Sequence, residues 1–582
     1  MATENLIVLI TMILYLLFML WIGRKTSEKV TDLDSYILAD RNVSWPMLAM
    51  TYLATVASTV QLLGQPGLAY ENGISLYFWE KIAVLTIIVI FTIPLARRLR
   101  RLGVSTIADI ALARFPESKR IHYVLSITQI IWGVFVAALS VFGGSLLVTA
   151  VTGIPLFISL LVIVGVTLGY TILGGLSAVV VTDSVQWAII IIGSAIFIPL
   201  LFLVIDPFTE FFSQYLGSDG FSLTQKANGT EMKQGFTDIY TLPVAPLTGI
   251  AFLITSGSLP AVDPSYAQRL LAAKSEKEGR KGLYVFAVMY LFVMILILSV
   301  GMYGTGLTPN LSNPDNVLLV MAQEYLPLFG KALFLTAVAA AAMSTVSSYL
   351  NVTAGMIVKN LILELKPNLS TQNQVRWARI CTVFVALATL SFAPIASGGL
   401  AVAANAAQMI LISAVGPLIY LILFWRKLSE TAAFWGTVIT SILTFILVLA
   451  VGGPDAAVLG PGIFGLPVQF WGLIIAAVSF VGLSYATPGI SIKKMPESFQ
   501  TLFKQKDAGP SKKSLLGMFI LWAILLAPLG YMKLVGKKFV IPPLNGPFAW
   551  ATDTGLIIIS VIVFGVSIYL ITRLIKFLKS ES

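Results

Sequence analysis

Fifteen apolar stretches, spread along the 582-residue chain, are each long enough to cross a lipid bilayer as a helix. About 20 apolar residues span the roughly 30 Å of hydrocarbon. The composition agrees, because only 11% of the residues are charged and the mean hydropathy is +0.90, whereas soluble proteins carry about a quarter charged residues. We therefore predict an all-α, polytopic integral membrane protein of about fifteen spans, with fourteen as the alternative, and with residues 1–582 forming one domain in the lipid bilayer. The predicted spans lie near 5–23, 47–70, 77–96, 124–150, 155–173, 184–205, 246–263, 283–305, 330–358, 378–396, 403–424, 430–451, 468–486, 514–533 and 554–575.

Positive charge is concentrated on one side of these spans. If residue 1 lies outside, alternate loops carry 31 of the 38 Lys and Arg residues. Because loops rich in Lys and Arg stay in the cytoplasm, we predict an outside N-terminus and a cytoplasmic C-terminus in the cell membrane. The net charge of +11 thus reflects membrane topology, and no nucleic-acid partner is expected. The single Cys381 and the single His122 exclude an intramolecular disulfide and a multi-histidine zinc site.

Glycine and proline interrupt two of the predicted spans. The second contains Gly64, Pro66 and Gly67, and the seventh contains Gly257 and Pro260. Such residues merely kink many membrane helices, but backbone groups freed at depth are tolerated only where they line a cavity or bind something. The two spans are five apart and enter the membrane in opposite orientations, which is typical of the inverted repeats of secondary transporters. We predict core repeats at about 47–205 and 246–424, with peripheral helices at 5–23 and 430–575.

A row of small and hydroxylated residues lies in the ninth predicted span, in AAAAMSTVSSYLN. On a helix Ala341, Ser344, Thr345 and Ser348 recur at i, i+3, i+4 and i+7, so they share one face. Hydroxyl oxygens with little bulk suit a hard cation, provided that a second element supplies free carbonyls. The same residue types also drive helix packing in membranes, so the pattern alone leaves both interpretations open.

Three charged residues lie in or beside the apolar segments. Asp183 follows Gly174–Gly175, a pair that favours a tight reversal of the chain. It either caps the next helix or serves a function at depth. Glu80 and Lys81, in the third span, either pair with other groups or extend to the membrane surface.

Three motifs together resemble the solute:sodium symporter family: GGLSAVVVTDSVQ, AAAAMSTVSSYLN and AQRLLAAKSEKEGRKG. The resemblance extends from about residue 30 to residue 430. It implies a leucine-transporter-type five-plus-five inverted repeat, with one extra N-terminal helix and about four extra C-terminal helices. It also implies a monomeric symporter, not an enzyme, that imports a small organic solute with sodium by alternating access. Family members carry sugars, sugar acids, amino acids and other carboxylates.

The same resemblance implies positions for the ions and the solute. The main Na⁺ site is expected at Ala54, Ala57, Ala341, Ser344 and Thr345. A second Na⁺ site is expected at Asp183, Ser344, Ser347 and Ser348. Substrate-binding positions are expected at Ser58, Gln61, Glu80, Ser256 and Tyr290.

The identity of the solute stays open at this point. Sugar-carrying members have an asparagine where this chain has Val56 and a lysine where it has Tyr290. Sialic-acid-carrying members have an arginine in the fourth span, and this chain has none between residues 124 and 150. A carboxylate could still bind the positive end of a half-helix.

A proton-coupled carrier of the same fold is the main alternative, since Glu80 and Asp183 are titratable. It would leave the hydroxylated face of the ninth span without a role. A channel or a membrane enzyme fits less well, because enzymes of this kind need clustered acid–base or metal-binding groups.

Overall fold

The computed structural model describes residues 2–26, 30–72, 93–204, 263–308, 311–459, 462–464, 466–489, 495–504 and 516. Within these ranges the chain is helical, and its only β-type pairings are two isolated bridges. The first half contains α1 (Ala2–Thr26), α2 (Leu33–Leu38), α3 (Trp45–Val56), α4 (Gln65–Asn72), α6 (Ile93–Leu102), α7 (Asp109–Arg114), α8 (Lys119–Thr152) and α9 (Leu156–Val204). The second half contains α13 (Pro264–Ala272), α14 (Glu276–Leu307), α15 (Val317–Tyr325), α16 (Leu328–Met356), α17 (Leu363–Leu365), α18 (Thr371–Phe392), α19 (Leu400–Phe424), α20 (Glu430–Ala450), α21 (Pro454–Leu459), α22 (Val468–Ala486) and α23 (Glu497–Lys504).

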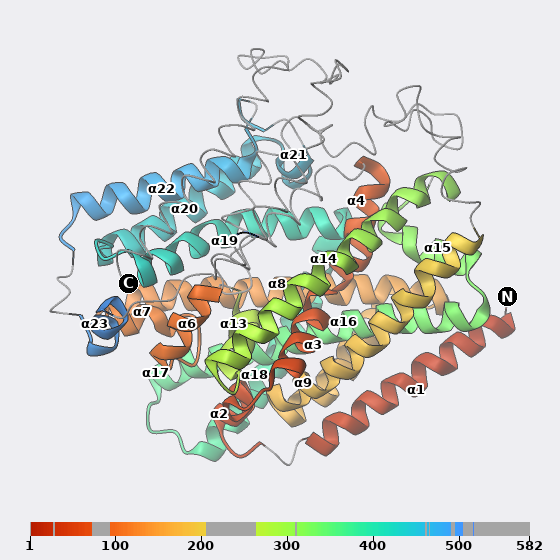
Figure 1. Cartoon of the computed structure of the whole chain (residues 1–582), viewed down its shortest axis with the longest axis horizontal. Helices are drawn as coiled ribbons and strands as arrows, with labels where there is room; N and C mark the ends of the chain where they lie inside the picture. The colour runs from red at the N-terminus through yellow and green to blue at the C-terminus, as the bar shows by residue number, and fades with distance from the viewer. Residues whose placement is uncertain are drawn as a thin grey trace.

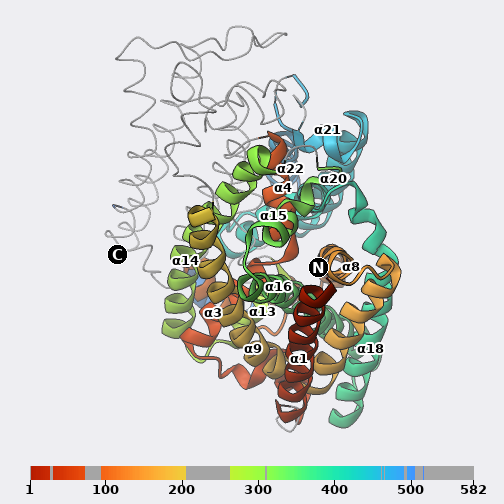
Figure 2. The ribbon, with the colours of Figure 1, turned by 90° about the vertical axis from the view of Figure 1, so that its right-hand side faces the viewer.

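Helix α16 lies at the centre of the bundle, between α8 and α9 (Figures 1 and 2). Its most apolar window is 94% buried, against 33% for α1 at the periphery. Small residues make this close packing possible. A Cβ on Gly144 of α8 would lie 2.7 Å from the Cβ of Ala342. The core of the fold is therefore built around the helix that carries the hydroxylated face.

The described residues contain eight helices long and apolar enough to span a membrane, or nine if a bent pair counts as one span. The predicted span 554–575, all of 246–263 and 514–533 except residues 263 and 516, and most of 77–96 lie outside the described residues. Helices α19, α20 and α22 run side by side on one flank, and α1 lies on another (Figure 1).

A reversal of the chain joins the predicted fifth and sixth spans within α9. Gly175 has φ 53° and ψ −148°, which lies outside the helical region. Tyr170 and Gln186 interact across this point, although a straight helix would place them about 24 Å apart. The tight reversal expected at Gly174–Gly175 is thus present.

Replacing Gly175 by alanine should lower the free energy of unfolding by about 2–4 kcal/mol, because this backbone conformation disfavours a side chain. The added Cβ would also lie 2.6 Å from the Tyr36 carbonyl oxygen. Thermal unfolding of the purified protein in detergent measures the effect. Gly165→Ala is the matched control, since a Cβ there meets nothing within 4 Å; equal stability of the two variants would contradict the strain.

Candidate functional site

The second predicted span is broken, but not at its glycines and proline. Trp45–Val56 and Val60–Glu71 meet at an angle of 56°, so the break falls at Ala57–Thr59. The expectation of a break at Gly64–Gly67 is wrong. Those glycines serve close packing instead: a Cβ on Gly64 would lie 2.7 Å from the backbone nitrogen of Ala401. A π-helical turn over Val60–Gly64 leads into α4.

The broken end of α3 meets the hydroxylated face of α16. Ser344 Oγ donates hydrogen bonds to the carbonyl oxygens of Ala54 (2.7 Å) and Ala341 (3.0 Å). Thr345 Oγ1 donates to the carbonyls of Thr55 (3.1 Å) and Ala341 (3.1 Å). All these residues are buried. Each hydroxyl and carbonyl oxygen keeps lone pairs that could face a cation.

The structure therefore gathers Ala54, Ala341, Ser344 and Thr345 of the predicted main sodium site. Ala57, the fifth predicted residue, comes directly after α3 and caps its C-terminus. Every ligand in this set is a neutral oxygen, which is the donor type that a hard monovalent cation prefers. The assignment to sodium itself stays a prediction.

A buried ion pair lies beside Ser348, which is one helical turn beyond Ser344 on α16. Arg269 of α13 donates from Nη2 to Asp183 Oδ2 at 2.9 Å, and both side chains are 0% exposed. Arg269 Nη2 also bonds to Ser348 Oγ, and its Nε donates to Thr51 Oγ1 at 2.8 Å. Asp183 Oδ1, in contrast, has no hydrogen-bond partner among the described residues. The pair links α3, α9, α13 and α16.

The position of Asp183 in α9 rules out the interpretation that it caps the N-terminus of a helix. It lies buried inside the second half of α9, eight residues beyond Gly175, and not at a helix N-terminus. Of its predicted partners, Ser348 contacts the same guanidinium, while Ser347 Oγ donates back to the Ser344 carbonyl at 3.0 Å.

A pocket of about 110 Å³ lies beside the meeting point of α3 and α16. It contains three of the predicted substrate-binding residues, Ser58, Gln61 and Tyr290, together with Thr345 of the predicted sodium site. Glu80 and Ser256 lie outside the described residues. The remaining lining residues are aromatic, aliphatic or polar: Thr55, Val56, Val60, Gln65, Trp132, Val136, Leu139, Asp263, Tyr266, Phe286, Tyr349, Ala404, Asn405 and Gln408.

Asp263 is held in this pocket at the start of α13. Its Oδ1 accepts hydrogen bonds from the backbone nitrogens of Ser265 (2.8 Å) and Tyr266 (3.2 Å). Its Oδ2 accepts from Trp132 Nε1 (2.5 Å) and Tyr349 Oη (2.7 Å). The side chain is 0% exposed, so a carboxylate is buried among four neutral donors.

Neither Arg269 nor Asp263 was expected from the sequence as a site residue. Arg269 lies within the motif AQRLLAAKSEKEGRKG, and the available signal was a charged residue just after a predicted apolar span. Asp263 precedes Pro264, the pattern of an N-cap followed by proline at the first helical position.

A bundle of membrane-spanning helices with a broken helix beside a central polar pocket is the architecture of a secondary transporter. A sequence model of the sodium:solute symporter family matches residues 36–440, and the chain belongs to this family.

Among curated proteins, the chain is 27% identical to the sodium/glucose cotransporter of Vibrio parahaemolyticus, over 72% of this chain and 80% of that protein. It is also 27% identical to the sodium/pantothenate symporter of Escherichia coli K12, over 61% of this chain and 71% of that protein. The relatives are transporters, so the chain is a multi-pass membrane protein of a sodium-coupled symporter family.

Two solved structures are similar in fold. A Na⁺-coupled sialic acid symporter in a substrate-bound outward-open state superposes with a TM-score of 0.68 at 18% identity, covering 84% of this chain and 99% of that one. Mhp1, a nucleobase-cation-symport-1 family transporter, gives a TM-score of 0.50 at 12% identity, covering 80% and 97%. The prediction of a leucine-transporter-type helical fold is confirmed.

Proposed function

We propose that this protein is a sodium-coupled symporter that imports a small organic solute by alternating access, as a monomer with its N-terminus outside and its C-terminus in the cytoplasm. The observation that carries the proposal is the contact of Ser344 and Thr345 with the carbonyls of Ala54 and Thr55. It joins the broken end of α3 to the hydroxylated face of α16, and it borders the pocket lined by Ser58, Gln61 and Tyr290.

Sodium would be bound by Ala54, Ala57, Ala341, Ser344 and Thr345. Because its ligands come from both α3 and α16, the ion favours the arrangement in which these helices meet. Thr55 and Ser58, at the broken end of α3, line the solute pocket, so sodium also orders part of the solute site. By linkage, the solute then raises the affinity for sodium by the same factor. A membrane potential of 100 mV adds about 2.3 kcal/mol per charge, or about fiftyfold accumulation.

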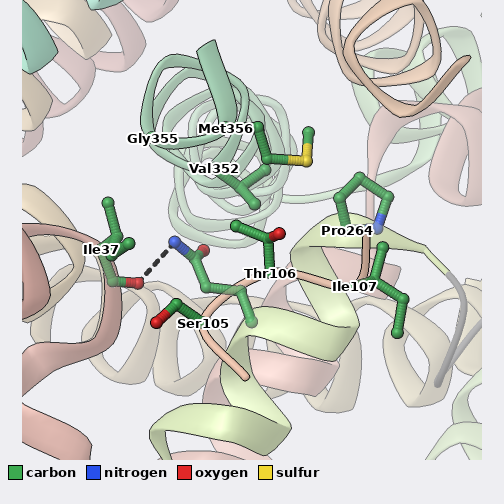
Figure 3. Close-up of a pocket in the computed structure, with 9 residues that line it drawn as sticks. Ile37, Ser105, Thr106, Ile107, Pro264, Val352, Gly355 and Met356 are labelled. Atoms are coloured by element: carbon green, nitrogen blue, oxygen red, sulfur yellow. Dashed lines mark hydrogen bonds between the residues drawn. The ribbon is translucent and has the colours of Figure 1, made fainter. Parts of the chain in front are cut away.

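Release of the solute would require opening the end of the bundle beside α2. There Gln268 Nε2 donates to the Ile37 carbonyl at 2.6 Å, the contact dashed in Figure 3, and to Asn351 Oδ1 at 3.0 Å. Asn351 Nδ2 donates to the Tyr36 carbonyl at 3.2 Å. The pocket beside Gln268 and Ile37 measures about 10 Å³, which holds about one water molecule and no solute. We infer that these contacts form the cytoplasmic gate, and loss of Gln268 should speed solute release measured by stopped flow.

A second sodium ion is proposed beside Asp183, with Ser344, Ser347 and Ser348. Asp183 Oδ1 is buried without a hydrogen-bond partner in the described part of the chain, and a cation there would satisfy it. Arg269 already neutralises Oδ2, so this ion would bind more weakly than the one at the main site.

Sodium dependence can be tested before the solute is known. The test is to add solutes carried by the relatives, first glucose and pantothenate, to the purified protein and to measure its thermal stabilisation in sodium and in choline at one pH. A symporter of this kind is stabilised by its solute at least tenfold more effectively in sodium, because the ion orders the pocket. Stabilisation that is equal in choline and that varies with pH would instead support the proton-coupled alternative.

A further inference from the structure

The N-terminus of α13 points its first backbone N–H groups at a carboxylate of the chain itself. In transporters with broken helices, the N-terminus of a half-helix is the usual position for an anionic group of the solute. Here Asp263 takes that position, with the N–H groups of Ser265 and Tyr266 at 2.8 and 3.2 Å. Trp132 and Tyr349 hold its other oxygen. A solute carboxylate would find this position filled.

Among the residues that the structure describes, no cation pairs with Asp263. Its four hydrogen-bond donors are neutral, and the nearby Arg269 is paired with Asp183 at 2.9 Å. Asp263 is also the only charged residue among the described residues that line the pocket. The described lining of the pocket therefore carries one negative charge.

The proposed main sodium site has only neutral oxygens as ligands, so the ion brings one positive charge next to this pocket. Sodium and Asp263 together sum to zero, and a neutral solute leaves that balance intact. A carboxylate would add one uncompensated negative charge to that balance. Its repulsion by Asp263 alone, about 6 Å away at an effective dielectric constant of about 20, is equivalent to about a hundredfold in affinity, and the nearby ion offsets part of that repulsion.

Three amide atoms in the pocket are buried without a hydrogen-bond partner among the described residues: Gln65 Oε1, Asn405 Nδ2 and Gln408 Nε2. Their side chains are 2%, 4% and 7% exposed. Such unpaired groups are costly to bury, and a ligand with matching donors and acceptors would satisfy them. Hydroxyl and amide groups, which both donate and accept, are suited to this mixture.

We propose that Asp263 selects the charge of the solute: the pocket accepts a neutral solute rich in hydroxyl or amide groups and rejects carboxylates. This inference rests on the proposed sodium-coupled function, and it names Asp263 as the residue that determines specificity.

Matched pairs of probes that differ by one carboxylate test the proposal: glucose with glucuronate, and panthenol with pantothenate. We expect the neutral member of a pair to stabilise the purified protein in sodium at concentrations at least tenfold lower than its acid. The discriminating variant is Asp263→Asn in a Trp132→Phe background, because the new amide N–H would otherwise face the indole N–H. The ratio should fall at least tenfold relative to Trp132→Phe alone.

Asp315→Asn is the matched control. Asp315 is a buried carboxylate outside the pocket that accepts a hydrogen bond from the Leu400 backbone nitrogen at 2.9 Å, so its replacement should leave the ratio unchanged. Tighter binding of the acids in the native protein, or a ratio that does not move in the Asp263 variant, would overturn the proposal. A ratio that holds equally in choline would support charge selection and count against sodium coupling.

Sodium alone gives a readout that needs no solute. If Asp263 balances the charge of the ion, the sodium concentration for half-maximal stabilisation should rise at least tenfold in the Asp263→Asn, Trp132→Phe protein. An unchanged sodium titration would refute the charge balance on which the selectivity depends.

Discussion

Replacing Ser344 and Thr345 together by alanine is expected to abolish sodium-dependent stabilisation and uptake, while the protein still inserts into the membrane. The two hydroxyls supply two of the five predicted sodium ligands and also bond to the carbonyls of Ala54 and Thr55. We expect the apparent sodium affinity to fall at least a hundredfold, which is about 2.7 kcal/mol. Sodium titrations followed by thermal unfolding in detergent measure this directly.

Thr336→Ala provides the matched control on the same helix. Thr336 is buried, and within the described part of the chain its Oγ1 donates to the Ala332 carbonyl at 2.7 Å. This variant therefore removes a hydroxyl of the same kind away from the predicted site. It should keep native sodium affinity. A double variant at Ser344 and Thr345 with native sodium dependence would refute the assignment of the main site.

Replacing Arg269 by alanine is expected to destabilise the protein by about 3–5 kcal/mol, because it leaves the fully buried Asp183 without its partner charge. Asp183→Asn combined with Arg269→Gln removes both charges and should recover a large part of that loss. The free energy of unfolding, or the yield of monodisperse protein, distinguishes the two. A single variant as stable as the double one would show that the pair is not coupled.

The same variants report on the proposed second ion. If sodium binds Asp183 Oδ1, the native protein should show a Hill coefficient above 1 for sodium, and the doubly neutral variant should show a coefficient of 1. A coefficient of 1 in both proteins would restrict coupling to the main site.

The meeting of the second and ninth spans could be predicted because its signals are local. Hydropathy marks the spans, and the spacing of Ala341, Ser344, Thr345 and Ser348 places them on one helical face. The position of the break could not be read from composition, because glycine and proline occur both at breaks and where backbones pack closely. Gly64 and Gly67 turned out to contact Ala401 and Asp315, and the helix bends at Ala57 instead.

The Asp183–Arg269 ion pair and the pocket around Asp263 could not be predicted from local sequence patterns, because they depend on contacts between residues far apart in the chain. Arg269 and Asp183 are 86 residues apart in sequence, and nothing local to either residue specifies its partner. The carboxylate of Asp263 is likewise held by Trp132 and Tyr349 from two other helices. Long-range pairing depends on how the helices pack, which a single sequence does not display.

The isolated β-bridge between the segment before α3 and the end of α13 holds these two helices together. Val43 N donates to the Ala272 carbonyl at 3.0 Å, and Lys274 N donates to the Val43 carbonyl at 2.8 Å. Nearby, Tyr52 Oη donates to the Tyr266 carbonyl at 2.7 Å, and the two rings stack. Moving α3 or α13 alone would break these contacts, whereas moving the two helices together preserves them. Any movement of this pair relative to α4 would have to bend the chain at Ala57–Thr59, beside the oxygens proposed to hold the ion.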